Sequence, residues 1–147
     1  MSTDHTADDP AELTLVGTVV SGSGEGARFT ALEWARAAFE QQLGFEPWPG
    51  TLNLQVTGTE WAEARHRSGP ESGIPVVPPE GYCAARCFPA LVAGRIHGAV
   101  VRPEVDGYPN DKLELLAPVF LRRTLELADG DTVELRVTLG PAGGGSP

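Results

Sequence analysis

A short glycine-rich segment near the start of the chain could bind an anion. Residues 22–26 (GSGEG) follow directly after the apolar run 13–20 (LTLVGTVV). Glycines can adopt positive φ angles and turn successive backbone N–H groups towards a phosphate. The segment does not end in Gly-Lys-Ser/Thr, as a P-loop does, and no βαβ unit follows it, as in a dinucleotide site. An ordinary glycine turn is the alternative interpretation.

Two oxygen-bearing side chains lie two residues apart after the Pro49-Gly50 turn. Thr51 and Asn53 alternate with apolar Leu52 and Leu54, so both point to the same side of a half-buried strand. A hydroxyl and an amide oxygen bind Mg²⁺ weakly, but in phosphoryl transfer the substrate phosphates and water supply much of the coordination. The pair could anchor Mg²⁺ beside a nucleotide, or could simply be polar residues on the wet face of a strand.

Two charged residues later in the chain could complete a phosphoryl-transfer site. Glu114 stands inside an apolar run, and if it faces inward it needs a partner such as a substrate hydroxyl. If it faces outward, it is ordinary strand alternation. Arg122 lies near the positive N-terminal end of a predicted helix and could bind a phosphate through two parallel hydrogen bonds. The alternative for Arg122 is a solvated helix arginine.

The two cysteines, Cys83 and Cys87, are predicted to be small buried hydrophobic residues. In an extended strand they would lie on one face roughly 13 Å apart, too far for a disulfide. Without a nearby group of histidines they also make a poor zinc site.

The elements that must position these residues follow from the apolar pattern. We expect strands at 13–20, 51–56, 82–92, 96–101, 113–116 and 132–139. We expect helices at 30–43, where Thr30 and Glu33 form a capping box and Gly44 ends the helix, at 59–67, and at 118–125 with Pro118 in the first turn. The segment 68–81 is predicted to be a loop. Six strands without regular strand–helix alternation predict a mainly β fold, a closed or nearly closed barrel with helical insertions.

The composition narrows the class of protein further. The 147 residues suit one domain, which we place at 12–140 between disordered ends at 1–11 and 141–147. The net charge of −9 and the lack of a basic patch argue against binding to nucleic acid. No window approaches the roughly 18 consecutive apolar residues of a membrane helix. The polar N-terminus lacks the features of a signal peptide, so we expect a cytoplasmic protein that does not bind membranes. A monomer is compatible with the sequence, which does not reveal the oligomeric state.

Read in order, these pieces resemble the archaeal-type CTP-dependent riboflavin kinase family. The matching segments are 17–26 (GTVVSGSGEG), 43–54 (LGFEPWPGTLNL), 98–101 (GAVV), 108–109 (YP), 113–122 (LELLAPVFLR) and 127–131 (LADGD). The similarity spans about residues 13 to 138. No single segment is diagnostic, but their order and spacing make a chance agreement improbable.

The resemblance implies a six-stranded cradle-loop barrel that phosphorylates riboflavin to FMN with CTP as donor and Mg²⁺ as cofactor. It implies that Thr51 and Asn53 hold the metal, and that Glu114 contacts the ribityl chain and is the catalytic residue. It implies a nucleotide site formed by Ser23, Gly24, Glu25, Gly26, Ala27 and Arg28 together with Val119, Phe120, Leu121 and Arg122.

One departure from the family bears on the acceptor. Where family members commonly have a flavin-contacting threonine, two residues before Tyr108, this chain has Asp106. An anion beside the phosphate of FMN is unfavourable unless it points away or meets a cation. The insertion at 68–80 has no clear counterpart and is either a lid or a surface loop. The alternatives are therefore a CTP-dependent kinase of another small hydroxyl compound and a non-catalytic barrel that binds a nucleotide or flavin.

Overall fold

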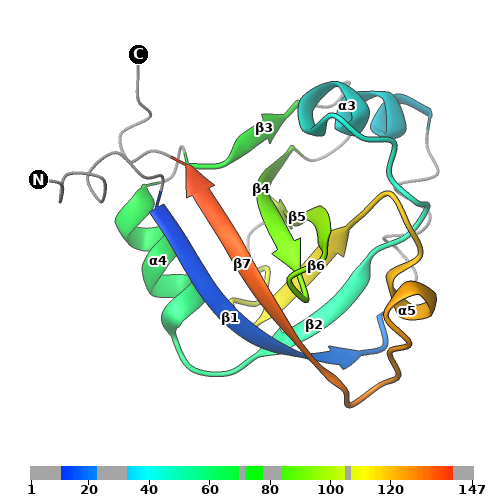
Figure 1. Ribbon diagram of the computed structural model, residues 1–147. Coiled ribbons are helices and arrows are strands. Elements are labelled where there is room, and N and C mark those ends of the chain that lie inside the picture. The colour runs from blue at the N-terminus through cyan, green and yellow to red at the C-terminus, as the bar shows by residue number, and fades with distance from the viewer. Residues whose placement is uncertain (1–10, 23–32, 70–71, 78–83, 105–106, 141–147) are drawn as a thin grey trace, which may run out of the picture.

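Six antiparallel strands form a closed barrel, with one further strand outside it (Figure 1). The computed structural model describes residues 11–22, 33–69, 72–77, 84–104 and 107–140. The barrel strands follow the order β4-β5-β6-β2-β1-β7, and β7 pairs back with β4 to close it. The prediction of a mainly β fold with a six-stranded barrel is confirmed.

The bounds of the elements are as follows. The strands are β1 (Ala11–Val20), β2 (Leu52–Val56), β3 (Ile74–Val76), β4 (Ala85–Val92), β5 (Ile96–Pro103), β6 (Lys112–Leu116) and β7 (Thr132–Gly140). The helices are α3 (Glu33–Leu43), α4 (Glu60–Ser68) and α5 (Leu121–Thr124). Within the described residues, no helix is long and apolar enough to span a membrane.

Strand β4 pairs with β5 along one edge, and its other edge is shared between two partner strands. Its first half pairs with the outside strand β3, where Val76 lies opposite Ala85. Its second half pairs with β7, where Ala90 lies opposite Val137. Strand β3 falls in the segment 68–81, so the prediction of a loop there was wrong. Three residues are too few for a reliable strand pattern, and it is the free edge of β4 that makes this segment extended.

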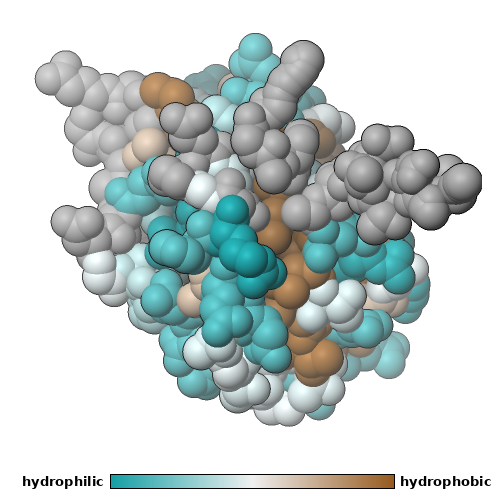
Figure 2. Space-filling view, turned by 90° about the vertical axis from the view of Figure 1, so that its left-hand side faces the viewer, coloured by the Kyte–Doolittle hydropathy of each residue, from teal (hydrophilic) through white to brown (hydrophobic). Residues whose placement is uncertain are grey.

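The barrel interior is filled by alternate residues of its six strands. The largest fully buried side chains of this cluster are those of Phe88, Leu54, Leu113, Leu115 and Leu135. Helix α4 adds Trp61, whose ring meets that of Phe88 edge-on at 5.5 Å. The opposite face of α4 is exposed and polar, and Figure 2 shows this side of the molecule, where hydrophilic residues flank a narrow hydrophobic strip.

A second apolar cluster lies on the outer face of the barrel, where α3 packs against β3, β4 and β5. Ala35 and Phe39 of the helix cover Cys87 and Val101. Cys87 is a free, fully buried thiol, as predicted, and burial raises its pKa to about 12. The thiol therefore stays protonated and unreactive. Cys83 lies outside the described residues.

The predicted helices differ from the observed ones mainly at their N-terminal ends. Helix α3 ends before Gly44, which has the expected positive φ of 85°, whereas Thr30 lies outside the described residues. The last helix was predicted to begin at Pro118, but α5 begins at Leu121. The preceding residue, Phe120, has an extended backbone (φ −77°, ψ 99°), because its ring stacks on Trp48 instead of joining a helix.

Gly98 is predicted to be essential for the pairing of β5 with β6. A Cβ atom at this position would lie 2.3 Å from the backbone oxygen of Leu116, so Gly98→Ala must push the two strands apart. We expect the free energy of unfolding to fall by about 3 kcal/mol, measured by urea denaturation. His97→Ala, at the exposed neighbouring position, is the control and should change stability by about 0.5 kcal/mol or less. Equal unfolding midpoints for both variants would contradict the steric argument.

Candidate functional site

Thr51, Asn53 and Glu114 come together on the outer face of the barrel. Strands β2 and β6 are antiparallel, and their register places Asn53 directly opposite Glu114. The alternating residues of both strands, such as Leu54 and Leu115, fill the barrel interior. Because side chains alternate along a strand, the polar residues must face outward. The sequence left open which way Glu114 faces, and the structure places it on the outer face.

Glu114 is nevertheless well enclosed and has two hydroxyl partners. Its side chain is only 15% exposed. Thr51 Oγ1 donates a hydrogen bond to Oε1 at 3.1 Å, and the hydroxyl of Tyr108 donates to Oε2 at 2.5 Å. These two bonds hold the carboxylate in one orientation. The proton of Thr51 is used on Glu114, which leaves the lone pairs of its oxygen available to a cation.

Tyr108 is surrounded by groups that keep it a hydrogen-bond donor. Burial raises its pKa well above the ordinary value, and the hydrogen bond to Glu114 raises it further. The charged groups of Arg102 and Lys112 lie 5.7 and 5.5 Å from the centre of its ring. The ammonium group of Lys112 also lies 3.9 Å from Glu114 Oε2, so these cations offset the negative charge of that carboxylate.

The segment that leaves β1 runs directly past Asn53. Val20 pairs with Asn53 across β1 and β2, and a Cβ atom built on Gly22 would lie 2.2 Å from Asn53 Nδ2. This close approach explains why a glycine stands at position 22. The predicted phosphate-binding segment therefore begins beside the predicted metal ligand. Its residues 23–28 lie outside the described residues, as does Asp106.

A cavity adjoins Thr51, and all four residues of the second predicted nucleotide segment, 119–122, line it. Its empty space is about 340 Å³, including its opening to solvent. Its walls are formed by Trp48, Pro49, Gly50, Thr51, Leu52, Leu115, Ala117, Val119, Phe120, Leu121 and Arg122.

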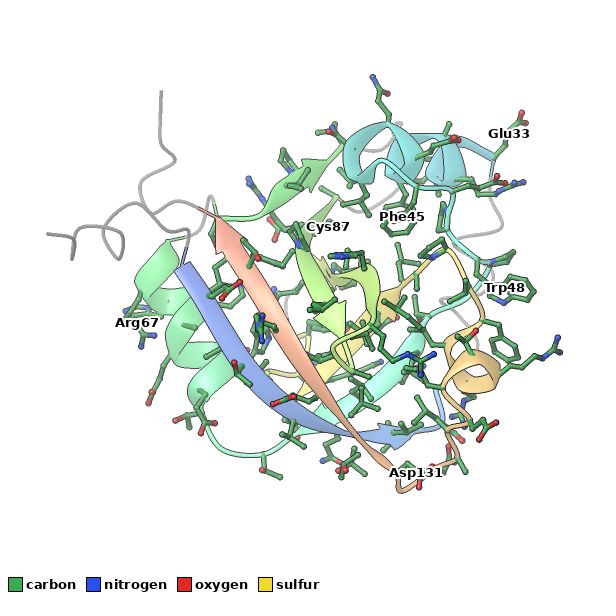
Figure 3. The ribbon with its side chains drawn as sticks, in the orientation of Figure 1. Glu33, Phe45, Trp48, Arg67, Cys87 and Asp131 are labelled. Atoms are coloured by element: carbon green, nitrogen blue, oxygen red, sulfur yellow. The ribbon has the colours of Figure 1, made fainter. Side chains whose placement is uncertain are left out.

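Two aromatic rings stand at the rim of this cavity. Trp48 and Phe120 stack at 5.5 Å with an angle of 10° between their planes, and they remain 44% and 37% exposed. In Figure 3, Trp48 lies beside the turn that carries α5, on the outside of the barrel. The guanidinium of Arg123 lies 5.5 Å from the ring of Phe120. The rim thus offers stacked, partly exposed rings next to a cationic group.

Arg122 connects the cavity to the end of β1 through an aspartate. Its Nη2 donates to Asp129 Oδ1 at 2.7 Å and to the backbone oxygen of Val20 at 3.4 Å. Ser21 Oγ donates to the other carboxylate oxygen of Asp129 at 2.6 Å. Two hydrogen bonds lower the pKa of Asp129 below its ordinary value. The bond from Ser21 has the larger effect and the bond from Arg122 the next largest.

The oxygen atoms at this site suit a metal only in the presence of a phosphate ligand. In the part of the chain that the structure describes, no group of three or more His, Cys, Asp or Glu side chains could hold a metal. Thr51 and Asn53 supply uncharged oxygens, the type of donor that Mg²⁺ accepts when phosphates and water complete its coordination. The residues therefore fit a metal that arrives with a nucleotide.

The sequence analysis gave no role to two residues that the structure brings into the site. Tyr108 and Asp129 were noted only as parts of family segments. The contact of Asp129 with Ser21 depends on tertiary structure, since it joins residues 108 positions apart, whereas Tyr108 meets Glu114 only six positions further along the chain. The signal that could have drawn attention to Asp129 was an acidic residue in a segment shared with a family of nucleotide-binding enzymes.

Comparison with known proteins establishes the family. Residues 19–137 match the sequence model of the family CTP-dep_RFKase, described as "Domain of unknown function DUF120". The chain belongs to this family. The resemblance inferred from the sequence is thereby confirmed.

Relatives from three archaeal genera carry the name riboflavin kinase. The chain is 45% identical to the protein of Pyrobaculum calidifontis over 134 residues, which cover 89% of this chain and 63% of the relative. It is 38% identical to the Methanococcoides burtonii protein over 136 residues and to the Halobacterium salinarum protein over 138 residues. Those matches each cover 88% of this chain and 59% of the relative. The chain thus spans about three fifths of the length of these curated relatives.

Replacing Ser21 should raise the pKa of Asp129. In Ser21→Ala the carboxylate loses its largest stabilising contact, so its pKa should move up towards the ordinary value near 4. A carboxyl ¹³C NMR titration measures this directly. The pKa of Asp129 is lower in the folded state than in the unfolded state. The stability that its contacts contribute is therefore fully present above the unfolded-state pKa and is lost as the pH falls through the folded-state pKa. An unchanged titration in Ser21→Ala would show that the hydroxyl does not stabilise the carboxylate.

Proposed function

We propose that this chain is a CTP-dependent riboflavin kinase, which transfers the γ-phosphoryl group of CTP to the 5′-hydroxyl of riboflavin and releases FMN and CDP. The observation that carries the proposal is the hydrogen-bonded group of Thr51, Glu114 and Tyr108. It lies opposite Asn53 and beside a cavity that Arg122 also lines. Membership of the family and the names of the relatives support the reaction.

The nucleotide occupies the region between the end of β1 and α5. Arg122 presents a planar guanidinium that can bind a phosphate through two parallel hydrogen bonds. Residues 119–122 line the cavity with Thr51, and Gly22 leads into the glycine segment at Asn53. In this proposal residues 23–28 supply backbone N–H groups to the phosphates. The choice of CTP as donor follows the name of the family.

Thr51 and Asn53 hold a magnesium ion that binds together with the nucleotide. Thr51 directs its proton to Glu114, so its oxygen can face the cation, and Asn53 supplies an amide oxygen from the same face of β2. When bound, the ion neutralises charge on the phosphates during transfer. Asn53 lies within β2 and Thr51 immediately precedes it, and a position in or next to a strand keeps the two side chains well defined.

Glu114 orients the hydroxyl of the acceptor. In the transfer, a bond forms between the riboflavin 5′-oxygen and the γ-phosphorus, while the bond from that phosphorus to the bridging oxygen of CDP breaks. The hydroxyl proton passes late to Glu114. The carboxylate already accepts bonds from Thr51 and Tyr108, and these hold it in one orientation towards the acceptor. Because this reaction mainly requires positioning and charge neutralisation, orientation is a sufficient role.

The direct test is incubation of the purified chain with riboflavin, Mg²⁺ and each nucleoside triphosphate in turn. We expect FMN, detected by chromatography, with CTP as the preferred donor. Glu114→Gln should lower kcat by roughly 100-fold because an amide cannot accept the proton. Glu134→Gln, on the exposed side of β7, is the control and should match the unchanged chain.

Two outcomes of this test would change the assignment. Failure to form FMN with any donor would reject the riboflavin kinase. Turnover of CTP with another hydroxyl compound but not with riboflavin would select the alternative acceptor that Asp106 suggests.

The metal ligands are tested separately from flavin binding. The double variant Thr51→Ala/Asn53→Ala should lose roughly 100-fold in kcat, since it removes both protein oxygens from the cation. Its affinity for riboflavin, followed by quenching of flavin fluorescence, should remain within about twofold, because the acceptor does not depend on the cation to bind. Full retention of turnover would show that the metal is held elsewhere. Binding of riboflavin by a chain that shows no turnover even before the substitutions would instead identify a non-catalytic binding barrel.

A further inference from the structure

Asp129 lies where three parts of the chain meet beside the cavity. Its two carboxylate oxygens are divided between Arg122, at the start of α5, and Ser21, just after β1. Arg122 lines the cavity, and Ser21 immediately precedes Gly22, which contacts Asn53. One side chain therefore bridges the arginine and the segment that leads past the predicted metal ligand.

The contacts of Asp129 are not needed to form its own turn. The turn is closed by Asp131, whose Oδ2 accepts the backbone N–H of Ala128 at 2.8 Å. It is joined to β1 by backbone bonds from Gly130 N to the oxygen of Val19 and from Val19 N to the oxygen of Asp131, both 2.8 Å. The Asp129 side chain is 55% exposed, and exposed ion pairs contribute little to stability. Folding alone does not explain this pair.

We propose that Asp129 is a positioning residue of the nucleotide site, which holds Arg122 and Ser21 in fixed places beside the cavity. This inference rests on the proposed function and extends it to a residue that contacts no substrate. It acts through Arg122 on the phosphates and through Ser21 on the segment next to Asn53.

The geometry of the arginine supports a positioning role. Among the described residues, the hydrogen bonds of the Arg122 guanidinium involve Nη2 alone. The guanidinium is planar and has five N–H donors. The two hydrogen bonds of Nη2 therefore restrict the orientation of the whole group, and the donors on Nε and Nη1 remain for a phosphate. Without Asp129, the long side chain of Arg122 could adopt many rotamers. Nucleotide binding would then have to order it, which lowers the affinity.

The charge of Asp129 does not argue against this role. An unpaired carboxylate near a triphosphate would weaken binding, but Asp129 is paired with the cation of Arg122 at 2.7 Å. The pair has no net charge, and the lowered pKa keeps the carboxylate ionised across the neutral range. If repulsion between Asp129 and the phosphates dominated, removing the carboxylate charge would lower the KM for CTP. The positioning role predicts a higher KM, so the two effects can be told apart.

The experiment compares Asp129→Asn, which keeps the shape and removes the charge, with Asp131→Asn in the same turn. We expect Asp129→Asn to raise the KM for CTP and the dissociation constant of CDP about tenfold, the size of one hydrogen bond to a charged group. The kcat and the KM for riboflavin should change less than about twofold. Asp131→Asn should lower the unfolding midpoint and leave the KM for CTP unchanged, because its side chain touches neither Arg122 nor Ser21.

A double-variant cycle shows whether Asp129 acts through the arginine. In the Arg122→Lys background, Asp129→Asn should have less than about a twofold further effect on the KM for CTP, because the partner it positions has gone. An unchanged or lower KM in Asp129→Asn would overturn the inference, and additive effects in the cycle would overturn the part of it that acts through Arg122.

Nucleotide affinity separates this inference from the proposed function. Titration calorimetry with CDP in the absence of riboflavin measures binding without turnover. If the chain binds CDP but forms no FMN, the kinase assignment fails while the Asp129 comparison still decides the inference. If the unaltered chain does not bind CDP or CTP, the inference fails as well.

Discussion

The candidate site depends on one register, the antiparallel pairing of β2 with β6 that sets Asn53 opposite Glu114. Because side chains alternate along a strand, a shift of one residue would turn both polar groups into the barrel and expose Leu54 and Leu115. The apolar residues between the site residues therefore fix the direction in which the site faces. The barrel core is fully packed, so the register cannot slip without losing most of the buried apolar surface.

The closed barrel also explains how residues far apart in sequence form one site. Thr51 meets Glu114 across 63 positions, and Arg122 meets Val20 across 102. The barrel closes where β7 pairs with the second half of β4, so these two strands have no unpaired edge there. Asn53 and Glu114 are held on strands, which keep their geometry fixed, whereas Thr51, Tyr108 and Arg122 lie in the segments between strands.

Positive side chains lie close to the candidate site although the chain as a whole is acidic. The net charge is −9, yet Arg102 and Lys112 flank the ring of Tyr108. Arg122 lines the cavity, and its charge is balanced by Asp129. Fields from distant surface charges are screened over about 10 Å in ordinary salt, whereas partly buried groups close to a ligand are screened far less. The proposed binding of phosphates therefore depends on these nearby groups more than on the net charge of the chain.

The sequence by itself determined the class of fold, the family and most of the strands, because these follow from local patterns. Alternation of apolar and polar residues located the strands of Thr51, Asn53 and Glu114, and Gly44 marked the end of α3. Only the tertiary structure decided what has no local signal. The free edge of β4 made β3 a strand, and the stacking of Phe120 on Trp48 delayed the start of α5. The bond from Thr51 to Glu114 and the bond from Ser21 to Asp129 join residues 63 and 108 positions apart, and no pattern of neighbouring residues encodes such distant pairs.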